Sequence, residues 1–331
     1  MYQTKVLSTG IYTPPKVLTN QDLEKFLDTS NEWIIERTGI KQRHVSSYQE
    51  GEFGTDMAHK ASLQALERAG LEANDIDLIL YATCTADYKL PSSSCVLQHK
   101  LGITNQCAAV DLAAACSGYV YAFHMADALI KTGMNKNVLI VGAEIMTREV
   151  DWEDRTMCVL FGDAAGATIL SRAEEGDASQ VLSSHISADG SGWDLFTHLK
   201  GGTKEPVTKE DIEERKNFMA MRGRDLFKVA TRTLAENVKI VAEKANVSID
   251  DINWLIPHQA NIRIIEHTGK ILDIPKEKVV INIQKYGNTS SATIPLAFHE
   301  AIEEGKIKRG DLVLFDAFGA GVTAGATLIR Y

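Results

Sequence analysis

The residue best suited to covalent chemistry in this chain is Cys116, which follows the apolar run 108–112 and the small residues Ala113-Ala114-Ala115. This pattern predicts a strand, a tight turn and then a helix, so the thiol lies at a strand-to-helix junction, like the nucleophile of a G-x-S-x-G elbow. The free N–H groups and the positive end of the helix dipole favour the thiolate and can stabilise an oxyanion. We therefore expect Cys116 to be a nucleophile in acyl transfer; the alternative is a small residue that merely fits a crowded turn.

Two further polar groups lie where predicted strands of the second half of the chain end. His258 follows the apolar run 254–257, and Asn288 follows a second predicted strand at residues 279–283. Sites in α/β proteins are assembled at strand ends, so both side chains are candidate partners for Cys116. Cys-His-Asn groups also occur in papain-like hydrolases, and hydrolysis is therefore an alternative to acyl transfer.

Short apolar runs alternate with longer segments of helical periodicity along the chain, which predicts an α/β fold. Other predicted strands lie at residues 76–82, 108–112, 138–141 and 312–315, and predicted helices at residues 53–69, 116–132, 225–245 and 291–304. The polar, glycine-rich segment 190–214 interrupts this alternation and is either a functional loop or a simple excursion.

The second half of the chain repeats short motifs of the first half in the same order. The echoes are Ala69-Gly70-Leu71 with Ala245-Asn246-Val247, Ala122-Phe123-His124 with Ala297-Phe298-His299, and Ala165-Gly166-Ala167-Thr168 with Ala324-Gly325-Ala326-Thr327. They predict two similar α/β halves, residues 1–172 and 173–331, packed in layers with a site where they meet. The middle echo has an offset of 175 residues, which places Ser291 at the position equivalent to Cys116 and brings Asn288 toward the same interface.

Composition and charge exclude several classes of protein. The chain has 331 residues, 44% of them hydrophobic and 24% charged, which is ordinary for a soluble globular protein. Its net charge of −9 and pI near 5.5 argue against nucleic acid as a partner. There is no apolar run of ~18 residues and no signal peptide, so we expect no membrane span. Five cysteines without CxxC spacing and histidines without metal spacing predict a cytoplasmic protein with reduced thiols and no metal.

Further motifs lie around these candidates along the whole chain. They are Thr29-Ser30-Asn31-Glu32-Trp33-Ile34, Arg37-Thr38-Gly39-Ile40, Ala115-Cys116-Ser117-Gly118, Asp154-Arg155, Phe161-Gly162-Asp163-Ala164-Ala165-Gly166-Ala167, His258-Gln259-Ala260-Asn261-Ile262-Arg263 and Tyr286-Gly287-Asn288-Thr289-Ser290. Together they resemble β-ketoacyl-acyl-carrier-protein synthase III, the initiating condensing enzyme of bacterial fatty-acid synthesis. The resemblance implies a duplicated thiolase-like α/β fold.

The resemblance also implies a role for each candidate in the reaction. Cys116 would accept the acyl group, while His258 and Asn288 would drive decarboxylation. The backbone N–H groups of Cys116 and Ala320 would form the oxyanion hole. The family usually has glycine at the position of Ala320. Alanine tolerates a positive φ poorly, so the geometry of this hole stays open.

The same resemblance assigns two substrate-binding groups. Trp33 would stack on the adenine-nucleotide end of coenzyme A, with Arg37 and Arg155 around the ring and phosphates and Asn261 nearby. Leu90, where the family commonly has an aromatic residue from the neighbouring subunit, and Met146 would line the acyl pocket. Because leucine is smaller than an aromatic ring and methionine adapts its shape, we expect primers longer than acetyl to be accepted.

An acidic carrier protein needs a locally positive surface on a chain with a net charge of −9. The residues that match the family's carrier-binding segment are Gln259, Ala260, Asn261, Ile262 and Arg263. Lys228 and Lys270, on predicted helices, can extend this surface, although a solvated helix face is the alternative meaning of such lysines.

The implied activity is a decarboxylative Claisen condensation of an acyl-CoA primer with malonyl-acyl-carrier protein, through a ping-pong acyl-enzyme mechanism. Acyl-CoA is then a substrate, no cofactor is needed, and the chain forms a homodimer. Two alternatives stay open: a related condensing enzyme or acyltransferase of a quinolone, pimelate or polyketide pathway, and a non-catalytic homologue that binds acyl-CoA or carrier protein.

Overall fold

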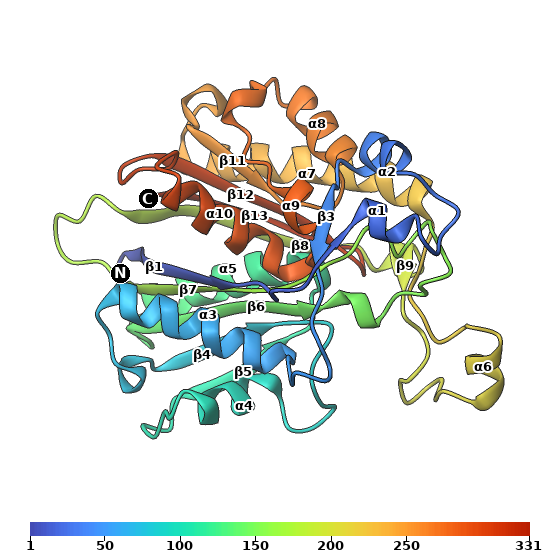
Figure 1. The fold of residues 1–331 in the computed structure, drawn as a ribbon. Coiled ribbons are helices and arrows are strands. Elements are labelled where there is room, and N and C mark those ends of the chain that lie inside the picture. Colours follow the sequence, from blue (N-terminus) through green and yellow to red (C-terminus); the bar gives the residue numbers. More distant parts are fainter.

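The computed structural model describes all residues from 1 to 331 and contains two main β-sheets (Figure 1). The first sheet has the order β1 (Thr4–Tyr12), β7 (Asp163–Arg172), β6 (Asn137–Ile145), β4 (Leu78–Ala82) and β5 (Ala108–Leu112). The second has the order β8 (Gln180–Ala188), β13 (Thr323–Arg330), β12 (Leu312–Gly319) and β11 (Trp254–Pro257). In both sheets the first two pairings are antiparallel and the next is parallel, so these four strands have the same topology, and β5 is a fifth strand of the first sheet only.

Helices cover both sheets and fill the space between them. The central helices α5 (Gly118–Lys131) and α10 (Thr293–Glu303) lie between the sheets, as Figure 1 shows. The outer helices are α3 (Gly54–Ala69) and α4 (Ser93–Lys100) on the first sheet, and α7 (Gly223–Ala245) and α8 (Ile262–Ile271) on the second. The α/β alternation of the sequence thus becomes layers of helix and sheet. No helix is long and apolar enough to span a membrane.

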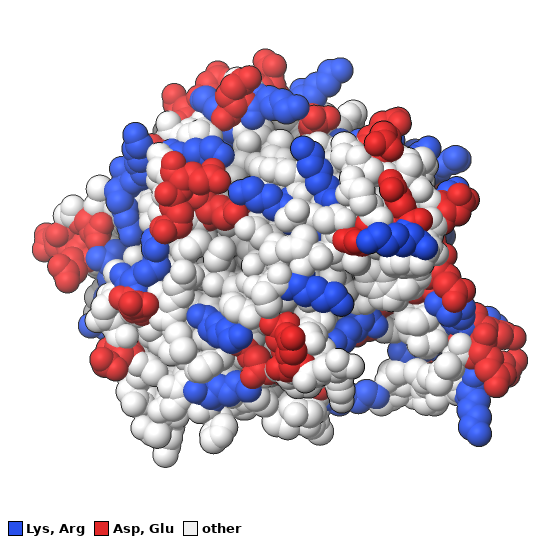
Figure 2. All heavy atoms as spheres, viewed as in Figure 1, with Lys and Arg blue, Asp and Glu red and all other residues white.

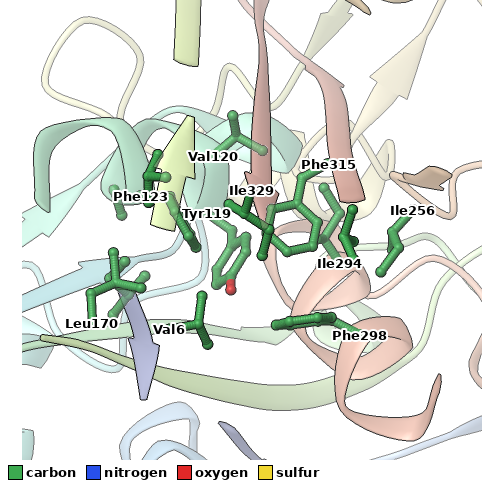
Figure 3. Packing of buried hydrophobic residues seen from close by; sticks show 14 of the residues in the cluster. Val6, Tyr119, Val120, Phe123, Leu170, Ile256, Ile294, Phe298, Phe315 and Ile329 are labelled. Carbon is green, nitrogen blue, oxygen red and sulfur yellow. The ribbon is translucent and has the colours of Figure 1, made fainter. Parts of the chain in front are cut away.

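The largest hydrophobic cluster lies between the two sheets and joins them (Figure 3). Phe123 of α5 and Phe298 of α10, which are echo residues of the sequence, both contact Phe315 of β12. The ring centroids are 5.6 Å and 5.0 Å from that of Phe315. Burying each such ring contributes about 2 kcal/mol or more, so this cluster stabilises the contact between the sheets.

Two sequence predictions about elements need correction. Residues 279–283 form no strand. Val279 makes a single parallel bridge to Leu255 of β11, the edge strand of the second sheet. This position corresponds to that of β5 in the first sheet, and the chain continues into α9 (Ile283–Tyr286). The predicted helices that start at Cys116 and Ser291 instead begin with the 3-10 turns η2 (Ala115–Ser117) and η7 (Ser290–Ala292). The β-branched run at 279–281 favours a strand locally, but the following residues leave the sheet toward the site.

The remaining strands and α-helices lie near one end of the two sheets (Figure 1). They are β2 (Val17–Thr19), α1 (Asn20–Leu23), α2 (Asn31–Thr38), β3 (Gln42–His44), β9 (Phe196–Thr197), α6 (Lys209–Glu213) and β10 (Ala220–Met221). Segment 190–214, which interrupts the sequence pattern, includes β9 and α6. It projects from the body of the protein at the lower right of Figure 1 and returns through β10, which pairs with β9.

Candidate active site

Cys116, His258 and Asn288 line one cavity of about 920 Å³. The predicted junction is present: β5 ends at Leu112 and Cys116 sits in the turn η2, before α5. Gly319 at the end of β12 packs directly against this turn. A Cβ at Gly319 would lie 2.9 Å from the Cys116 backbone nitrogen, so only glycine allows this approach. The two halves of the chain therefore meet at the thiol.

The electrostatic surroundings of Cys116 differ from the sequence prediction. Burial raises the pKa of its thiol to about 12, and the Ser290 hydroxyl beside it offsets only part of that increase. The buried carboxylate of Glu144 raises the pKa further. Burial therefore opposes the helix-terminus effect that the sequence predicts to favour the thiolate, and the raised pKa keeps the thiol protonated. Removing the charge from water outweighs a helix dipole effect, which rarely exceeds about 2 kcal/mol.

His258 is fixed at the end of β11 by its backbone and its ring. Its backbone N–H donates to the carbonyl of Asp316 at 2.7 Å, and ring atom Nδ1 lies 2.6 Å from Thr293 Oγ1. Burial lowers the pKa of His258 to about 3, so the ring is neutral at physiological pH. A neutral imidazole has one N–H group, which can donate a hydrogen bond into the cavity. Unlike the imidazolium ion, it does not readily transfer that proton.

The backbone of Asn288 is held by residues 160–162, which belong to the first half of the chain. Its backbone N–H donates to the carbonyl of Leu160 at 2.8 Å, and its carbonyl accepts the N–H of Gly162 at 3.2 Å. The side-chain Oδ1 accepts the backbone N–H of Ser290 at 2.8 Å. Because the oxygen is occupied, the amide NH₂ is the group left to donate into the cavity.

Ala320 also lines the cavity, in the turn between β12 and β13. The positive φ in this turn belongs to Gly321, at 130°, and not to Ala320. The alanine is therefore accommodated without the strain that the sequence suggested. Thr323 connects this turn to the cysteine turn, because its Oγ1 lies 3.1 Å from the carbonyl of Ala320, 3.0 Å from that of Ala114 and 2.7 Å from Ser117 Oγ.

Trp33 on α2 also lines the cavity. The guanidinium carbons of Arg37 and Arg155 lie 4.7 Å and 5.3 Å from its ring centroid. Trp33 and Arg37 line the cavity, whereas Arg155 does not and donates instead to Asp28. Asn261, at the N-terminus of α8, donates to the carbonyl of Arg37 at 3.0 Å and so connects α8 to α2. The four predicted CoA-binding residues are therefore neighbours.

The charged residues that line the cavity are all cationic. They are Arg37, Arg224, Lys228 and Arg263, and no aspartate or glutamate is among the lining residues. Elsewhere the charges are mixed: Figure 2 shows Lys and Arg interspersed with Asp and Glu over the face drawn there. A lining of one sign in a chain with a net charge of −9 favours an anionic ligand at this opening.

The residues predicted to bind a carrier protein differ in whether a docking protein could reach them. Gln259 is only 1% exposed and its amide donates to the carbonyls of Pro257 and Val280, so it supports the segment from inside and is not available to a docking protein. Ala260 and Arg263 line the cavity, and Ile262 packs against Gly39. Lys228 is exposed on α7 and lines the cavity, whereas Lys270 is exposed on α8 outside it.

The two predicted acyl-pocket residues do not line the cavity of the single chain. Leu90 is 87% exposed, in a loop that Asp87 anchors by accepting the backbone N–H groups of Gly54 and Thr55 at the start of α3. Met146 is buried, with its sulfur 3.9 Å from the thiol of Cys84. Within one chain, these residues therefore lie outside the cavity that contains Cys116.

Sequence reasoning missed the hydroxyl and carboxyl groups around the three central residues. Glu144 is buried and accepts hydrogen bonds from Ser290 at 3.0 Å and Thr85 at 2.6 Å, while Thr293 contacts His258. Each of these groups contacts a residue far away in the sequence, and single serines and threonines are common in any chain. The sequence therefore gave little indication that they belong to the site. The motif around Asn288 does contain Ser290, which was the one available sign.

Comparison with known proteins places the chain in a family. The family model of 3-oxoacyl-[acyl-carrier-protein (ACP)] synthase III matches residues 110–190, and the model of its C-terminal part matches residues 242–331. The β-ketoacyl-[acyl-carrier-protein] synthase III of Aliarcobacter butzleri is 47% identical over 325 residues, which cover 98% of this chain and 96% of that protein.

Solved structures of condensing enzymes have the same fold as this chain. The crystal structure of 3-oxoacyl-[acyl-carrier-protein] synthase III from Aquifex aeolicus is 48% identical, with a TM-score of 0.91, and the match covers 99% of this chain and 100% of that one. The priming β-ketosynthase from the R1128 polyketide pathway is 29% identical, with a TM-score of 0.90 and coverage of 99% and 96%. The predicted thiolase-like fold is confirmed. On these matches, which span nearly its full length, the chain belongs to the β-ketoacyl-acyl-carrier-protein synthase III family.

Proposed function

We propose that this chain condenses an acyl-CoA primer with malonyl-acyl-carrier protein and releases β-ketoacyl-carrier protein, CoA and CO₂. One observation supports this most directly: a thiol, a neutral imidazole and an amide NH₂, from Cys116, His258 and Asn288, line one cavity. A thiol suits acyl transfer between thioesters, and two neutral donors suit the stabilisation of an enolate. The reaction needs no cofactor.

In the first half-reaction the sulfur of Cys116 attacks the carbonyl carbon of the acyl-CoA. The bond from that carbon to the CoA sulfur breaks, and the proton of the Cys116 thiol ends on the CoA sulfur. The backbone N–H groups of Cys116 and Ala320 would bind the negative oxygen of the tetrahedral intermediate. Because the leaving group and the nucleophile are both thiols, the transfer is nearly balanced in free energy.

In the second half-reaction the malonyl group loses CO₂, and the electron pair of the broken C–C bond forms an enolate. Its charge is located on the thioester oxygen, which accepts hydrogen bonds from His258 and Asn288. The enolate carbon attacks the acyl carbonyl carbon, and the bond to the Cys116 sulfur breaks. The thiolate that results regains a proton from water, which completes the cycle.

The shape and charge of the cavity fit the two substrates. Its cations, among them Arg37, Arg224 and Lys228, are suited to the phosphates of CoA and of a phosphopantetheine arm. Trp33 offers a flat surface for the adenine ring, and 16 of the 27 lining residues are hydrophobic, which suits an extended acyl-pantetheine chain. We assign the exposed surface of Lys228, Arg263 and Lys270 to the acidic carrier protein.

We further propose that the chain works in the cytoplasm as a homodimer. The edge strand β5 has no neighbour on one side, and its Val110 is exposed, as are Tyr88 and Leu90 in the adjacent loop. Exposed apolar groups at an open sheet edge favour pairing with a second copy. Such pairing would bring Leu90 of one copy toward the acyl pocket of the other. Multi-angle light scattering tests this, and a monomer at micromolar concentration would contradict it.

The experiment that tests the proposed function separates the two half-reactions. Acylation is measured as the mass increase of the intact protein with acyl-CoA, and decarboxylation as CO₂ release from malonyl-carrier protein. Cys116→Ala is expected to form no acyl-enzyme. Asn288→Ala is expected to acylate normally but to release CO₂ about 10²–10³ times more slowly. Loss of acylation in Asn288→Ala would show that the assigned division of roles is wrong.

The pathway served by this activity is a separate question, because a polyketide priming enzyme has the same fold. A panel of acyl-CoA primers with malonyl-carrier protein, analysed by mass spectrometry of the products, distinguishes the cases. Use of short saturated primers supports fatty-acid initiation. Exclusive use of aromatic or dicarboxylic primers would instead indicate a specialised pathway.

A further inference from the structure

Thr293 is buried next to His258 and lies outside the cavity lining. It is the first residue of α10 and is 2% exposed, and its Oγ1 lies 2.6 Å from Nδ1 of His258. The repeat offset of 175 residues pairs Thr293 with Gly118, the first residue of α5, which has no side chain. The hydroxyl is thus present only in the half of the chain that contains the histidine.

The hydrogen bond between Thr293 and His258 can be formed in two ways. Either the hydroxyl donates to Nδ1, or a protonated Nδ1 donates to the hydroxyl, whose own proton then goes to the carbonyl of Ser290 at 3.0 Å. That carbonyl already accepts the backbone N–H of Thr293. The distance of 2.6 Å is also shorter than the ordinary range of about 2.7–3.2 Å for an N–H donor to oxygen.

We infer that Thr293 is a positioning residue that donates its hydroxyl proton to Nδ1 of His258 and thereby fixes the ring in the tautomer with hydrogen on Nε2. The nitrogen left to face the cavity is then a hydrogen-bond donor. This inference rests on the proposed function, because an N–H at this position matters only if an enolate oxygen forms there. A neutral histidine in the other tautomer would present a lone pair to that oxygen and repel it.

The inference assigns Thr293 to one half-reaction. An Nε2–H donor stabilises the charge that develops during decarboxylation, whereas transfer of the acyl group to Cys116 relies on the oxyanion hole formed by backbone N–H groups. Removing the hydroxyl should therefore slow CO₂ release and spare acylation. A purely structural role of Thr293 would affect both half-reactions equally.

The most direct test is the tautomer itself. The protein, labelled with ¹⁵N in its histidines, is examined by long-range ¹H–¹⁵N NMR, and the signals of His258 are identified by their loss in His258→Ala. We expect hydrogen on Nε2 and a bare Nδ1 in the wild type. Hydrogen on Nδ1 in the wild type would overturn the inference, whatever the variants do.

Kinetics of isosteric variants provide the second test. Thr293→Val removes the hydroxyl at nearly constant volume and is expected to reduce CO₂ release about 10²-fold with acylation changed less than threefold. Thr293→Ser, which retains the donor, should keep CO₂ release within a few fold of the wild type. Equal loss of both half-reactions in Thr293→Val, or unchanged CO₂ release, would overturn the inference.

The chain offers a matched control in a second buried threonine–histidine pair. Thr9 Oγ1 lies 2.9 Å from Nδ1 of His299, and neither residue lines the cavity. Thr9→Val makes the same chemical change and should leave CO₂ release unaltered. If the wild type released no CO₂ from malonyl-carrier protein at all, the proposed function would fail, whereas the NMR result would still decide the tautomer.

Discussion

Ala115 and Ser290 lie 175 positions apart and have nearly the same left-handed backbone conformation, with φ of 45° and 50°. Each begins a 3-10 turn that leads into one of the two central helices. Such a conformation costs a residue with a side chain about 1–2 kcal/mol, yet both halves keep it. The next residue is Cys116 in one half and Ser291 in the other. The hydroxyl of Ser291 lies 2.9 Å from Glu144 and 3.0 Å from the carbonyl of Ala82, so it is engaged internally.

The raised pKa of Cys116 makes a prediction about its reactivity with iodoacetamide. Only the thiolate is alkylated, and a thiol with a pKa of about 12 is almost fully protonated at pH 7. The alkylation rate of Cys116 should therefore rise about tenfold per pH unit between pH 7 and 9, as measured by peptide mass mapping. The exposed Cys95 in the same digest provides an internal reference and should react faster at pH 7. A rate for Cys116 that levels off below pH 8 would contradict the prediction.

The lowered pKa of His258 makes a prediction about stability. With a folded pKa of about 3 and an ordinary unfolded value near 6.5, the unfolded chain binds a proton between these pH values that the native protein does not. The stability contributed by the neutral ring is present above pH 6.5 and is lost as the pH falls toward 3. Between pH 6.5 and 4.5 the wild type should lose about 2 kcal/mol more than His258→Gln in urea unfolding. If the free energy of unfolding fell with pH to the same extent in the wild type and in His258→Gln, the lowered pKa of His258 would be refuted.

Docking of the carrier protein is best tested at Lys270. Arg263 lines the cavity and donates to the carbonyl of Glu36 on α2, so its substitution would disturb both half-reactions. Lys270 lies outside the cavity, and Lys270→Glu should raise the KM for malonyl-carrier protein several fold at low salt, with acylation by acyl-CoA unchanged. The control is Lys308→Glu. Lys308 precedes the start of β12, whereas the end of β12 lies at the cavity, so this change should leave the KM for malonyl-carrier protein unaltered. An increase that persists at 0.5 M salt would argue against electrostatic docking.

Primer choice is expected to depend on Leu90 once two copies associate. Leucine leaves more space than an aromatic ring, and each additional buried methylene contributes about 0.8 kcal/mol, or about fourfold in affinity. The wild type should therefore accept isobutyryl- and hexanoyl-CoA as well as acetyl-CoA, and Leu90→Phe should shift kcat/KM toward acetyl-CoA. A wild type restricted to acetyl-CoA, with no change in Leu90→Phe, would show that this position does not limit the pocket.

The sequence was sufficient to predict the α/β layers and that Cys116, His258 and Asn288 come together, as they do in lining one cavity. Apolar runs that end at polar residues indicated Cys116 and His258, and the repeat offset of 175 residues brought Asn288 toward the same interface, although the strand expected before Asn288 is absent. The protonation of Cys116 could not be predicted, since it depends on burial and on Glu144, a residue of β6, which is separated from β5 in the sheet by β4.

Side-chain direction was equally beyond the sequence. Gln259 lies directly after His258 in the chain, but it points into the protein and donates to the carbonyls of Pro257 and Val280. The predicted strand at residues 279–283 failed for a related reason. Its β-branched residues favour a strand, but only Val279 pairs with the sheet before the chain turns toward Asn288.

The central claim is that an acyl group on Cys116 is the intermediate that a malonyl unit consumes. The decisive measurement is a single turnover: the acyl-enzyme is formed with acyl-CoA, freed of excess substrate, and mixed with malonyl-carrier protein. The acyl mass should map to the peptide of Cys116 and then disappear, with one CO₂ and one β-ketoacyl-carrier protein formed per acyl group. Release of free acid without β-ketoacyl product, or an acyl group on another cysteine, would contradict the account.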